Sequence, residues 1–161
     1  MISFLLAALL FSQSAATAPG AGALPKIGSP APQLVFTGSY DVEVGGQSFT
    51  RYELAVANAE SYSEVLFAPS AELPPCGNNR QAARTWIDIF DGAGARIYGF
   101  CAIGKARDLR LLWFALPKGA TPPAQVYIEM NDRLLGQVYR SPPIALPAPG
   151  KRQPSIEGSS R

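Results

Sequence analysis

The sequence contains no histidine, and this absence excludes several classes of catalytic site and metal site. Serine or cysteine nucleophiles activated by histidine are excluded, and so are metal sites built on imidazole ligands. Cys76 and Cys101 are the only cysteines, which is too few for a four-thiolate zinc site. We therefore predict a protein that carries no metal ion and no cofactor.

The two cysteines, Cys76 and Cys101, are the next candidates for chemistry. An even pair in an exported chain predicts a disulfide bond, which stabilises a fold by about 3 to 4 kcal/mol for a loop of this length. The alternative is a redox-active pair. Because no Cys-x-x-Cys motif is present and no histidine could activate a thiolate, we favour the structural bond.

Acidic residues offer two further chemical interpretations. Asp88 and Asp91 flank Phe90 and could bind calcium or act as the carboxylate pair of a glycoside hydrolase. The simpler interpretation is that Asp91 begins an Asp-Gly turn and Asp88 is a solvated strand residue. We favour it, because calcium needs more oxygen ligands than two residues supply. The same holds for Glu129 and Asp132.

The segment 76–84 is the best candidate for a binding surface, because polar loops held rigidly are common functional sites. Two prolines precede it, and the predicted disulfide would hold it to the rest of the fold. Its polar side chains are Asn78, Asn79, Arg80 and Arg84. The alternative is that Arg80 and Arg84 only stabilise the fold, by capping carbonyl groups or by pairing with Glu72 or Asp88.

Aromatic side chains could form a surface for sugars or peptides. In a β-rich domain we expect most of them, including both tryptophans, in the core or in cross-strand pairs. The candidates are Trp86, Tyr98, Phe100, Trp113, Phe114, Tyr127 and Tyr139.

These residues are carried by a chain whose pattern predicts short strands. Residues 85–90 and 96–103 are rich in β-branched and aromatic residues, and Asp-Gly-Ala-Gly between them predicts a hairpin at the centre of the fold. Residues 61–67 fit either a short helical turn or a brief strand. Residues 109–115 are apolar on both faces, which predicts a central strand. Further strands are expected at 34–36, 40–44, 51–58, 125–130 and 137–141.

This spacing of strands and turns favours an all-β fold, an antiparallel β-sandwich of about seven or eight strands. Apolar residues make up 47% of the 161 residues, which suits one domain with a core. The net charge is only +2 and the basic residues are scattered, so we predict no nucleic-acid partner.

The first residues, 1–18, have the features of a secretory signal peptide. Their apolar run is shorter than the roughly 20 residues of a membrane span, and Ala-Thr-Ala at 16–18 fits a cleavage site, with Ala23 as the other position. No Lys or Arg precedes the run, so an uncleaved anchor or a misassigned start codon is the alternative. We predict a secreted or periplasmic protein with a flexible leader at 19–32, a folded domain at 33–146 and a disordered tail at 147–161.

The C-terminal third resembles the end of a fibronectin type III or related immunoglobulin-like domain. The resembling segments are a penultimate strand at 126–130, a hairpin turn at 131–136, and a final strand from Tyr139 to Ile144. The resemblance implies that Trp86 is a core tryptophan of an early strand. Residues 73–77, 84–89 and 98–101 also resemble segments of small exported bacterial proteins of unknown function.

Taken together, these features predict an exported, non-catalytic binding or structural module. Its partner would be a protein or a glycan in the periplasm or outside the cell, with no membrane span after signal cleavage. One alternative is a carboxylate-based hydrolase acting on carbohydrate. Another is a protease inhibitor that presents the loop from Pro74 to Gly77.

The export and disulfide predictions can be tested together by the intact mass of the protein recovered from its native host. We expect a chain that starts at Pro19 or just after Ala23, with two alkylatable thiols that appear only after reduction. A full-length chain with two free thiols would contradict both predictions.

Overall fold

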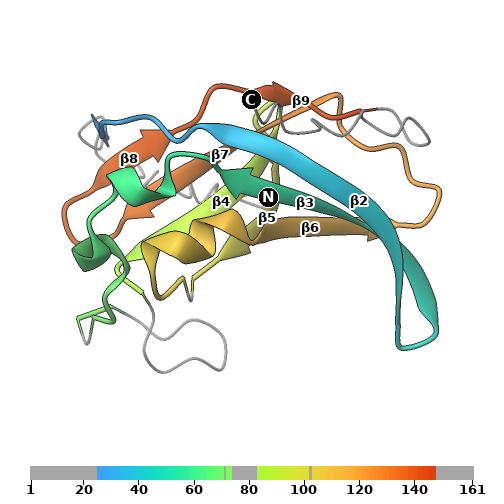
Figure 1. Ribbon diagram of the computed structural model, residues 1–161, viewed down its shortest axis with the longest axis horizontal. Helices are drawn as coiled ribbons and strands as arrows, with labels where there is room; N and C mark the ends of the chain where they lie inside the picture. The colour runs from blue at the N-terminus through green and yellow to red at the C-terminus, as the bar shows by residue number, and fades with distance from the viewer. Residues whose placement is uncertain (1–24, 71, 74–82, 102, 148–161) are drawn as a thin grey trace, which may run out of the picture.

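A computed structural model describes residues 25–70, 72–73, 83–101 and 103–147 of the chain. Within these ranges the chain forms strands and three short 3-10 turns, with no α-helix (Figure 1). The strands are β1 (Lys26–Ile27), β2 (Leu34–Val44), β3 (Gln47–Val56), β4 (Thr85–Asp91), β5 (Arg96–Phe100), β6 (Leu112–Pro117), β7 (Gln125–Asp132), β8 (Gln137–Arg140) and β9 (Ile144–Ala145). The 3-10 turns are η1 (Ala59–Ser61), η2 (Glu64–Phe67) and η3 (Ala106–Arg110).

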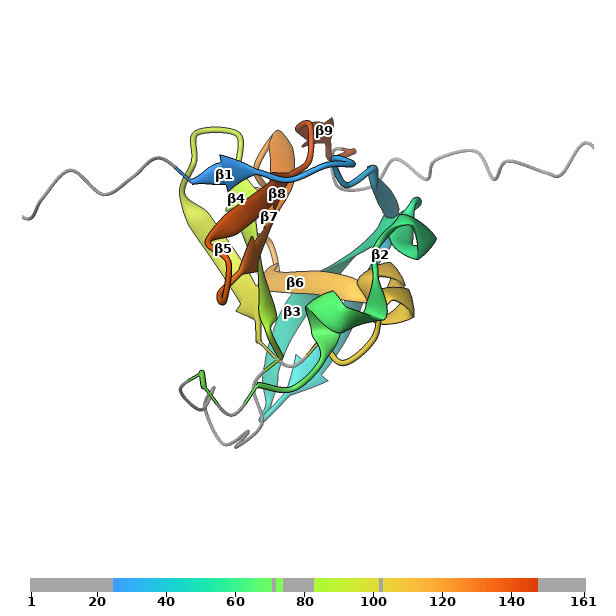
Figure 2. The same ribbon diagram turned by 90° about the vertical axis from the view of Figure 1, so that its left-hand side faces the viewer.

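The strands form two sheets, which confirms the predicted all-β architecture. The larger sheet has the order β1-β8-β7-β4-β5, with β9 added beside β7, and the smaller sheet has the order β2-β3-β6. All pairings are antiparallel except that of β1 with β8. Figure 2 shows the strands of the larger sheet on the left and those of the smaller sheet on the right.

The hairpin of β4 and β5 is present as predicted, and β4 lies inside the larger sheet between β5 and β7. Its turn differs in detail from the expected Asp-Gly turn. The left-handed residue is Gly94, with φ of 89°, and not Gly92. The carboxylate of Asp91 accepts hydrogen bonds from the backbone N–H groups of Ala93 (2.9 Å) and Ala95 (2.8 Å) and so organises the turn.

The core lies between the inner faces of the two sheets. Alternate residues of β4 and β7 point inward, among them Ile87, Ile89 and Ile128, all fully buried. In the smaller sheet Tyr52 stacks on Phe114 of the paired strand, with ring centroids 5.0 Å apart. The inward alternation predicted for residues 51–58 and 125–130 is therefore confirmed.

An irregularity in β2 changes which face its side chains occupy. Phe36 pairs with Leu54 and packs against the core, but the register then shifts by one residue around Thr37. After this bulge, Tyr40 lies opposite Arg51 on the outer face of the smaller sheet. The sequence showed the alternation of this segment, but not the shift that turns its aromatic residue toward solvent.

The prediction of a central strand at 109–115 is wrong. Leu109 is buried in η3, Leu111 is 72% exposed, and the strand that follows, β6, lies at an edge of the smaller sheet. Both faces of β6 are apolar for another reason. Its inner residues fill the core, and Trp113 on the outer side packs against Tyr98 of β5 across the seam between the sheets.

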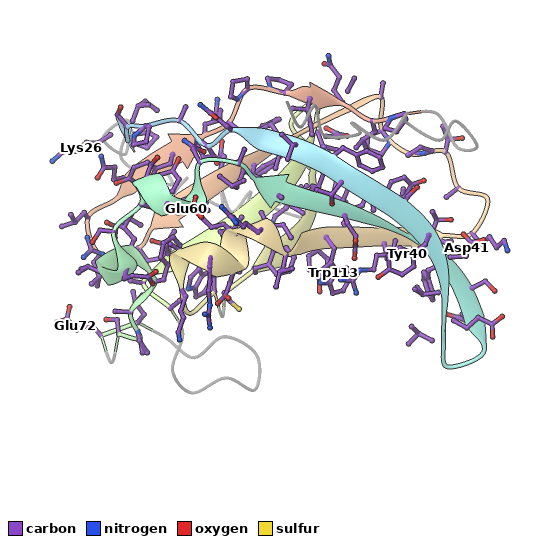
Figure 3. All side chains as sticks on the ribbon, in the orientation of Figure 1. Lys26, Tyr40, Asp41, Glu60, Glu72 and Trp113 are labelled. Carbon is purple, nitrogen blue, oxygen red and sulfur yellow. The ribbon has the colours of Figure 1, made fainter. Side chains whose placement is uncertain are left out.

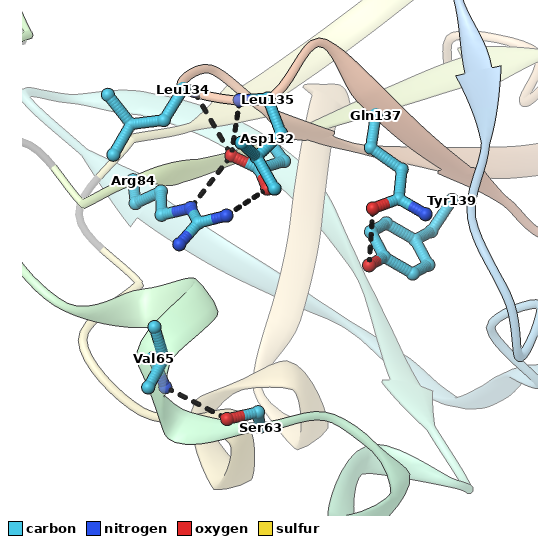
Figure 4. Close-up of polar contacts among 8 residues, drawn as sticks. All are labelled: Ser63, Val65, Arg84, Asp132, Leu134, Leu135, Gln137 and Tyr139. Atoms are coloured by element: carbon cyan, nitrogen blue, oxygen red, sulfur yellow. Dashed lines mark hydrogen bonds and ion pairs between the residues drawn. The ribbon is translucent and has the colours of Figure 1, made fainter.

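The ambiguous segment 61–67 contains the 3-10 turn η2. Ser63 caps it by accepting a hydrogen bond from the backbone N–H of Val65 at 3.4 Å, as Figure 4 shows. Phe67 at its end is fully buried, so this turn adds to the core between the sheets.

The folded domain begins earlier than predicted, because residues 25–32 are not a flexible leader. β1 pairs with β8, and Asn58 ties down the segment that follows by accepting from Gln33 N–H (2.8 Å) and donating to the Ala31 carbonyl (3.0 Å). The Tyr62 hydroxyl donates to the Pro30 carbonyl at 2.8 Å. Burial raises the pKa of Tyr62 from its ordinary value of 10.0 to about 12, so this donor keeps its proton into the alkaline range.

The close approach of β1 to β8 makes Gly28 a sensitive position. A Cβ at Gly28 would lie 2.6 Å from Cζ of the buried Tyr139 ring, so Gly28→Ala is expected to destabilise the fold by about 1 to 3 kcal/mol. Gly38→Ala is the matched control, because nothing lies within 4 Å of its Cβ position. Urea unfolding of both variants measures the difference, and equal midpoints would contradict the packing of β1 on Tyr139.

Candidate functional site

Most of the predicted binding loop lies outside the described residues. This applies to Asn78, Asn79 and Arg80 and to Cys76, so their roles and the Cys76–Cys101 bond stay predictions. The described end of the loop is anchored by backbone hydrogen bonds. Ala83 N–H donates to the Cys101 carbonyl at 3.1 Å, and Arg84 N–H donates to the Ala68 carbonyl at 3.0 Å.

Arg84 forms a two-point ion pair with Asp132 at the end of β7 (Figure 4). Its Nε donates to Oδ1 at 2.8 Å and an Nη donates to Oδ2 at 2.6 Å. The Asp132 side chain is fully buried, and its Oδ1 also accepts from the N–H groups of Leu134 (3.0 Å) and Leu135 (3.2 Å). Arg84 is therefore held by the fold, with Asp132 as partner in place of the expected Glu72 or Asp88.

Two opposing effects set the pKa of Asp132. Burial acts to raise it, but the hydrogen bonds from Arg84 and from the turn amides outweigh burial and lower the pKa below its ordinary value. Sequence reasoning missed this pair. The available signal was Asn-Asp-Arg before a turn, since an aspartate there often accepts from amides two or three residues ahead.

The carboxylates of Asp88 and Asp91 do not come together. Residues three positions apart in a strand point to opposite faces of the sheet. Asp88 instead lies directly opposite Glu129 of β7, on the outer face of the larger sheet. Arg96 Nε donates to Asp88 at 2.6 Å, and Arg140 Nε donates to Glu129 at 2.7 Å. We call these four residues the charged ladder: Asp88 and Glu129 in the middle, with Arg96 on one side and Arg140 on the other.

A groove with a volume of about 470 Å³ lies beside the charged ladder on the outer face of the larger sheet. The Asn131 amide links the groove to the ladder by donating to Asp88 Oδ2 at 3.3 Å. Its polar lining comes mainly from β4, β7 and β8 and the turn between the last two, namely Asp88, Glu129, Asn131, Asp132, Arg133 and Gln137.

The expectation that both tryptophans are core residues is wrong. Trp86 and Trp113 are half-buried and lie on the outer faces of the larger and the smaller sheet, between inward-pointing neighbours. The guanidinium of Arg133 stacks over the Trp86 ring at 4.1 Å from its centroid. The Nε1 of Trp86 is buried and has no hydrogen-bond partner among the described residues.

The smaller sheet presents a second outer surface, which we call the aromatic face. It consists of Tyr40, Arg51 and Trp113, joined at the seam by Tyr98 and Phe100. The Arg51 guanidinium lies 4.5 Å from the Trp113 ring centroid and 5.9 Å from that of Tyr40. Figure 3 shows Trp113 on β6 and Tyr40 on β2 along the same sheet.

The aromatic face remains open to solvent. Tyr40 is 47% exposed and Tyr98 is 37% exposed, although both contact other members of the face. The Tyr40 hydroxyl donates to Glu53 at 3.0 Å, which holds the ring in place from the neighbouring strand. The outer surface of the larger sheet combines the charged ladder with aromatic rings, since Phe90 stacks on Tyr127 with ring centroids 5.2 Å apart, whereas that of the smaller sheet is centred on the aromatic face.

No group of three or more potential ligand residues that could hold a metal ion occurs in the described part of the chain. The same residues include no helix long and apolar enough to cross a membrane. A comparison with protein-family models, curated proteins and solved structures finds no match to this chain. Its function has to be argued from its own surfaces.

The Arg84–Asp132 pair predicts a large stability loss for Asp132→Asn. We expect about 2 to 3 kcal/mol, somewhat below the usual cost of breaking a fully buried pair, because the Arg84 side chain keeps 16% exposure. Asp88→Asn is the control, since its partner Arg96 is 60% exposed and such pairs contribute about 1 kcal/mol or less.

The same pair predicts a pH dependence. In the unfolded chain Asp132 binds a proton near its ordinary pKa of 3.8, whereas the folded chain binds it only at lower pH. The stabilisation is therefore complete above about pH 4 and is lost as the pH falls through the folded pKa. Urea unfolding at pH 7 and pH 3 should show the difference between wild type and Asp132→Asn shrinking at low pH. A constant difference would contradict the ion-pair argument.

Proposed function

We propose that this protein is an exported, non-catalytic binding module with an immunoglobulin-like β-sandwich fold. The observation that carries the proposal is the aromatic face, in which Tyr40, Arg51, Trp113 and Tyr98 form a connected surface on rigid strands. Tyrosine, tryptophan and arginine are the residues that dominate binding energy at protein interfaces. We therefore propose a protein partner for this surface.

The strand order supports the immunoglobulin-like assignment. In that fold the first, second and fifth main strands share one sheet, and the third, sixth and seventh share the other. With β1 and β9 set aside, β2, β3 and β6 occupy the first set of positions, and β4, β7 and β8 the second, with β5 as an additional strand at the edge. This chain differs from the expected pattern in Trp86, which lies on the outer face of its strand.

The composition of the aromatic face supports its role as a protein interface. Its central arginine lies 4.5 Å from the Trp113 ring centroid and 5.9 Å from that of Tyr40, and Glu53 of the same face lies 3.4 Å from the Arg51 Nε. Aromatic residues and arginine are the residue types enriched in the cores of protein interfaces, where other charged residues are depleted. The rings are also preorganised by their mutual contacts, which lowers the entropy lost on binding.

The hydrolase alternative is less well supported. Asp88 and Glu129 lie opposite each other, but each is already engaged by an arginine of the neighbouring strand across the open face of the sheet. The inhibitor alternative rests on the loop from Pro74 to Gly77, which lies outside the described residues.

Export and the Cys76–Cys101 disulfide are part of the same proposal. Ala83 N–H donates to the Cys101 carbonyl at 3.1 Å, so the described end of the loop lies beside Cys101. A bond there would connect the loop to β5, whose Tyr98 and Phe100 contribute to the aromatic face.

The proposal predicts that Trp113→Ala abolishes partner retention and that Asp88→Asn does not. Wild type and both variants are immobilised and exposed to a cell-envelope extract of the native host. We expect a protein retained stoichiometrically by wild type and by Asp88→Asn, with at least tenfold less retained by Trp113→Ala, because that change removes the ring on which Arg51 stacks.

Two outcomes would contradict this prediction. Retention that is equal for all three baits would show that the aromatic face does not bind the partner. Release of sugar from a polysaccharide panel by wild type, lost in Asp88→Asn and in Glu129→Gln, would support the hydrolase instead.

A further inference from the structure

We propose that the free edge of β2 binds an extended segment of the partner protein, which pairs with β2 as an added strand and carries basic residues alternating with apolar ones. This inference rests on the proposed function, because it describes how the partner of the aromatic face is held. β2 is an edge strand of the smaller sheet, and its hairpin with β3 extends past the ends of the neighbouring strands (Figure 1).

The turn of this hairpin determines which backbone groups of β2 face the free edge. Gly45 and Gly46 have φ angles of 59° and 77° and form a two-residue loop. The hydrogen-bonded pair that closes such a loop is here Val44 with Gln47. Because hydrogen-bonded and non-hydrogen-bonded pairs alternate along an antiparallel ladder, the preceding residue, Glu43, directs its N–H and C=O away from β3.

A hydrogen bond on the other side of β3 agrees with this alternation. Ser48 lies opposite Glu43, and its carbonyl faces away from β2 and accepts from the N–H of Lys118 at 2.9 Å. By the same period, Ser39 and Asp41 also direct their backbone groups to the free edge. In the described ranges, no backbone hydrogen bond joins these three positions of β2 to anything beyond β3. An antiparallel strand added here would exchange two hydrogen bonds with each of them.

The outer face of the hairpin offers an apolar surface beside this edge. Tyr40, Val42 and Val44 point to the same side, so they extend the aromatic face along the hairpin. Val42 lies opposite Phe49, and Val44 is 65% exposed. Apolar residues of an added strand would lie next to Tyr40 and the two valines, where cross-strand pairs stabilise a sheet.

The other side of the edge is acidic. Asp41 and Glu43 point away from the aromatic face, and residues 34–50 contain no lysine or arginine. Asp41 pairs with Lys118 at 2.9 Å, whereas Glu43 forms no ion pair with any described residue. A lysine or arginine opposite Glu43 would supply that partner, so charge complementarity favours a basic strand. A second copy of β2 would bring two acidic edges together, which is unfavourable.

The test uses a capped synthetic peptide of about seven residues in which lysine alternates with valine or tyrosine. We expect it to bind wild type in isothermal titration calorimetry. Glu43→Lys should weaken binding by about three- to tenfold at low salt, because attraction becomes repulsion, and glutamate at the facing peptide position should restore it. Glu72→Lys is the matched control, because it makes the same change of charge at an exposed position far from Tyr40 and Asp41 (Figure 3).

N-methylation of the peptide separates strand addition from charge attraction alone. Methyl groups on the lysine N–H groups, which would face β2, should abolish binding, whereas methyl groups on the valine N–H groups should not. Equal loss from both, no binding of the lysine peptide, a preference of wild type for a glutamate peptide, or an equal effect of Glu72→Lys would each overturn the proposal. A wild-type dimer that Asp41→Pro dissociates would assign the edge to a second copy instead.

Failure of this proposal can be told apart from failure of the proposed function. Trp113 lies on β6, two strands away from β2, so Trp113→Ala should leave peptide binding unchanged while it abolishes partner retention. Partner retention that is lost in Trp113→Ala but kept in Glu43→Lys, without peptide binding, would keep the aromatic face and overturn strand addition. Peptide binding with partner retention that Trp113→Ala does not change would support the strand site and contradict the aromatic face. Circular dichroism of each variant establishes that it is folded.

Discussion

The antiparallel register of β4 against β7 is the constraint on which the rest of the structure depends. It places Ile89 opposite Ile128 on the inner face and Asp88 opposite Glu129 on the outer face, and it brings the end of β7 to Arg84. A slip of one residue would turn the isoleucines to solvent and the acids into the core. Core packing and the charged ladder therefore enforce the same alignment from opposite sides of one strand pair.

The two outer faces differ because different local features shape them. On the larger sheet, alternation along β4, β7 and β8 and a register shift between β4 and β5 bring acids and arginines of four neighbouring strands into line, so charge is neutralised across the sheet. On the smaller sheet, the bulge at Thr37 breaks the alternation of β2 and turns Tyr40 toward Arg51. A register shift in each sheet therefore decides which charged or aromatic side chains reach its outer face.

The sequence predicted local structure well where periodicity was strong. The β4–β5 hairpin, the inner faces of β3 and β7 and the turn before β8 follow from alternation and turn residues. The sequence did not predict features that depend on a single inserted residue or on a strand far away along the chain. A bulge such as that at Thr37 leaves no periodic signal, β6 is apolar because Trp113 meets β5 from the other sheet, and the Arg84–Asp132 pair joins residues 48 positions apart. The charged ladder likewise depends on strand order, which alternation alone cannot supply.

The sequence also favoured a loop as the binding site, whereas the described strands carry the better candidates. Tyr40, Arg51 and Trp113 are already held by sheet pairing and by their contacts with one another, so little conformational entropy would be lost when they bind a partner. Arg84, the described member of the loop set, uses its charge to stabilise the turn after β7 and thereby the edge of the groove. The described arginine of the predicted loop therefore acts through the fold, because its pair with Asp132 joins the start of β4 to the end of β7.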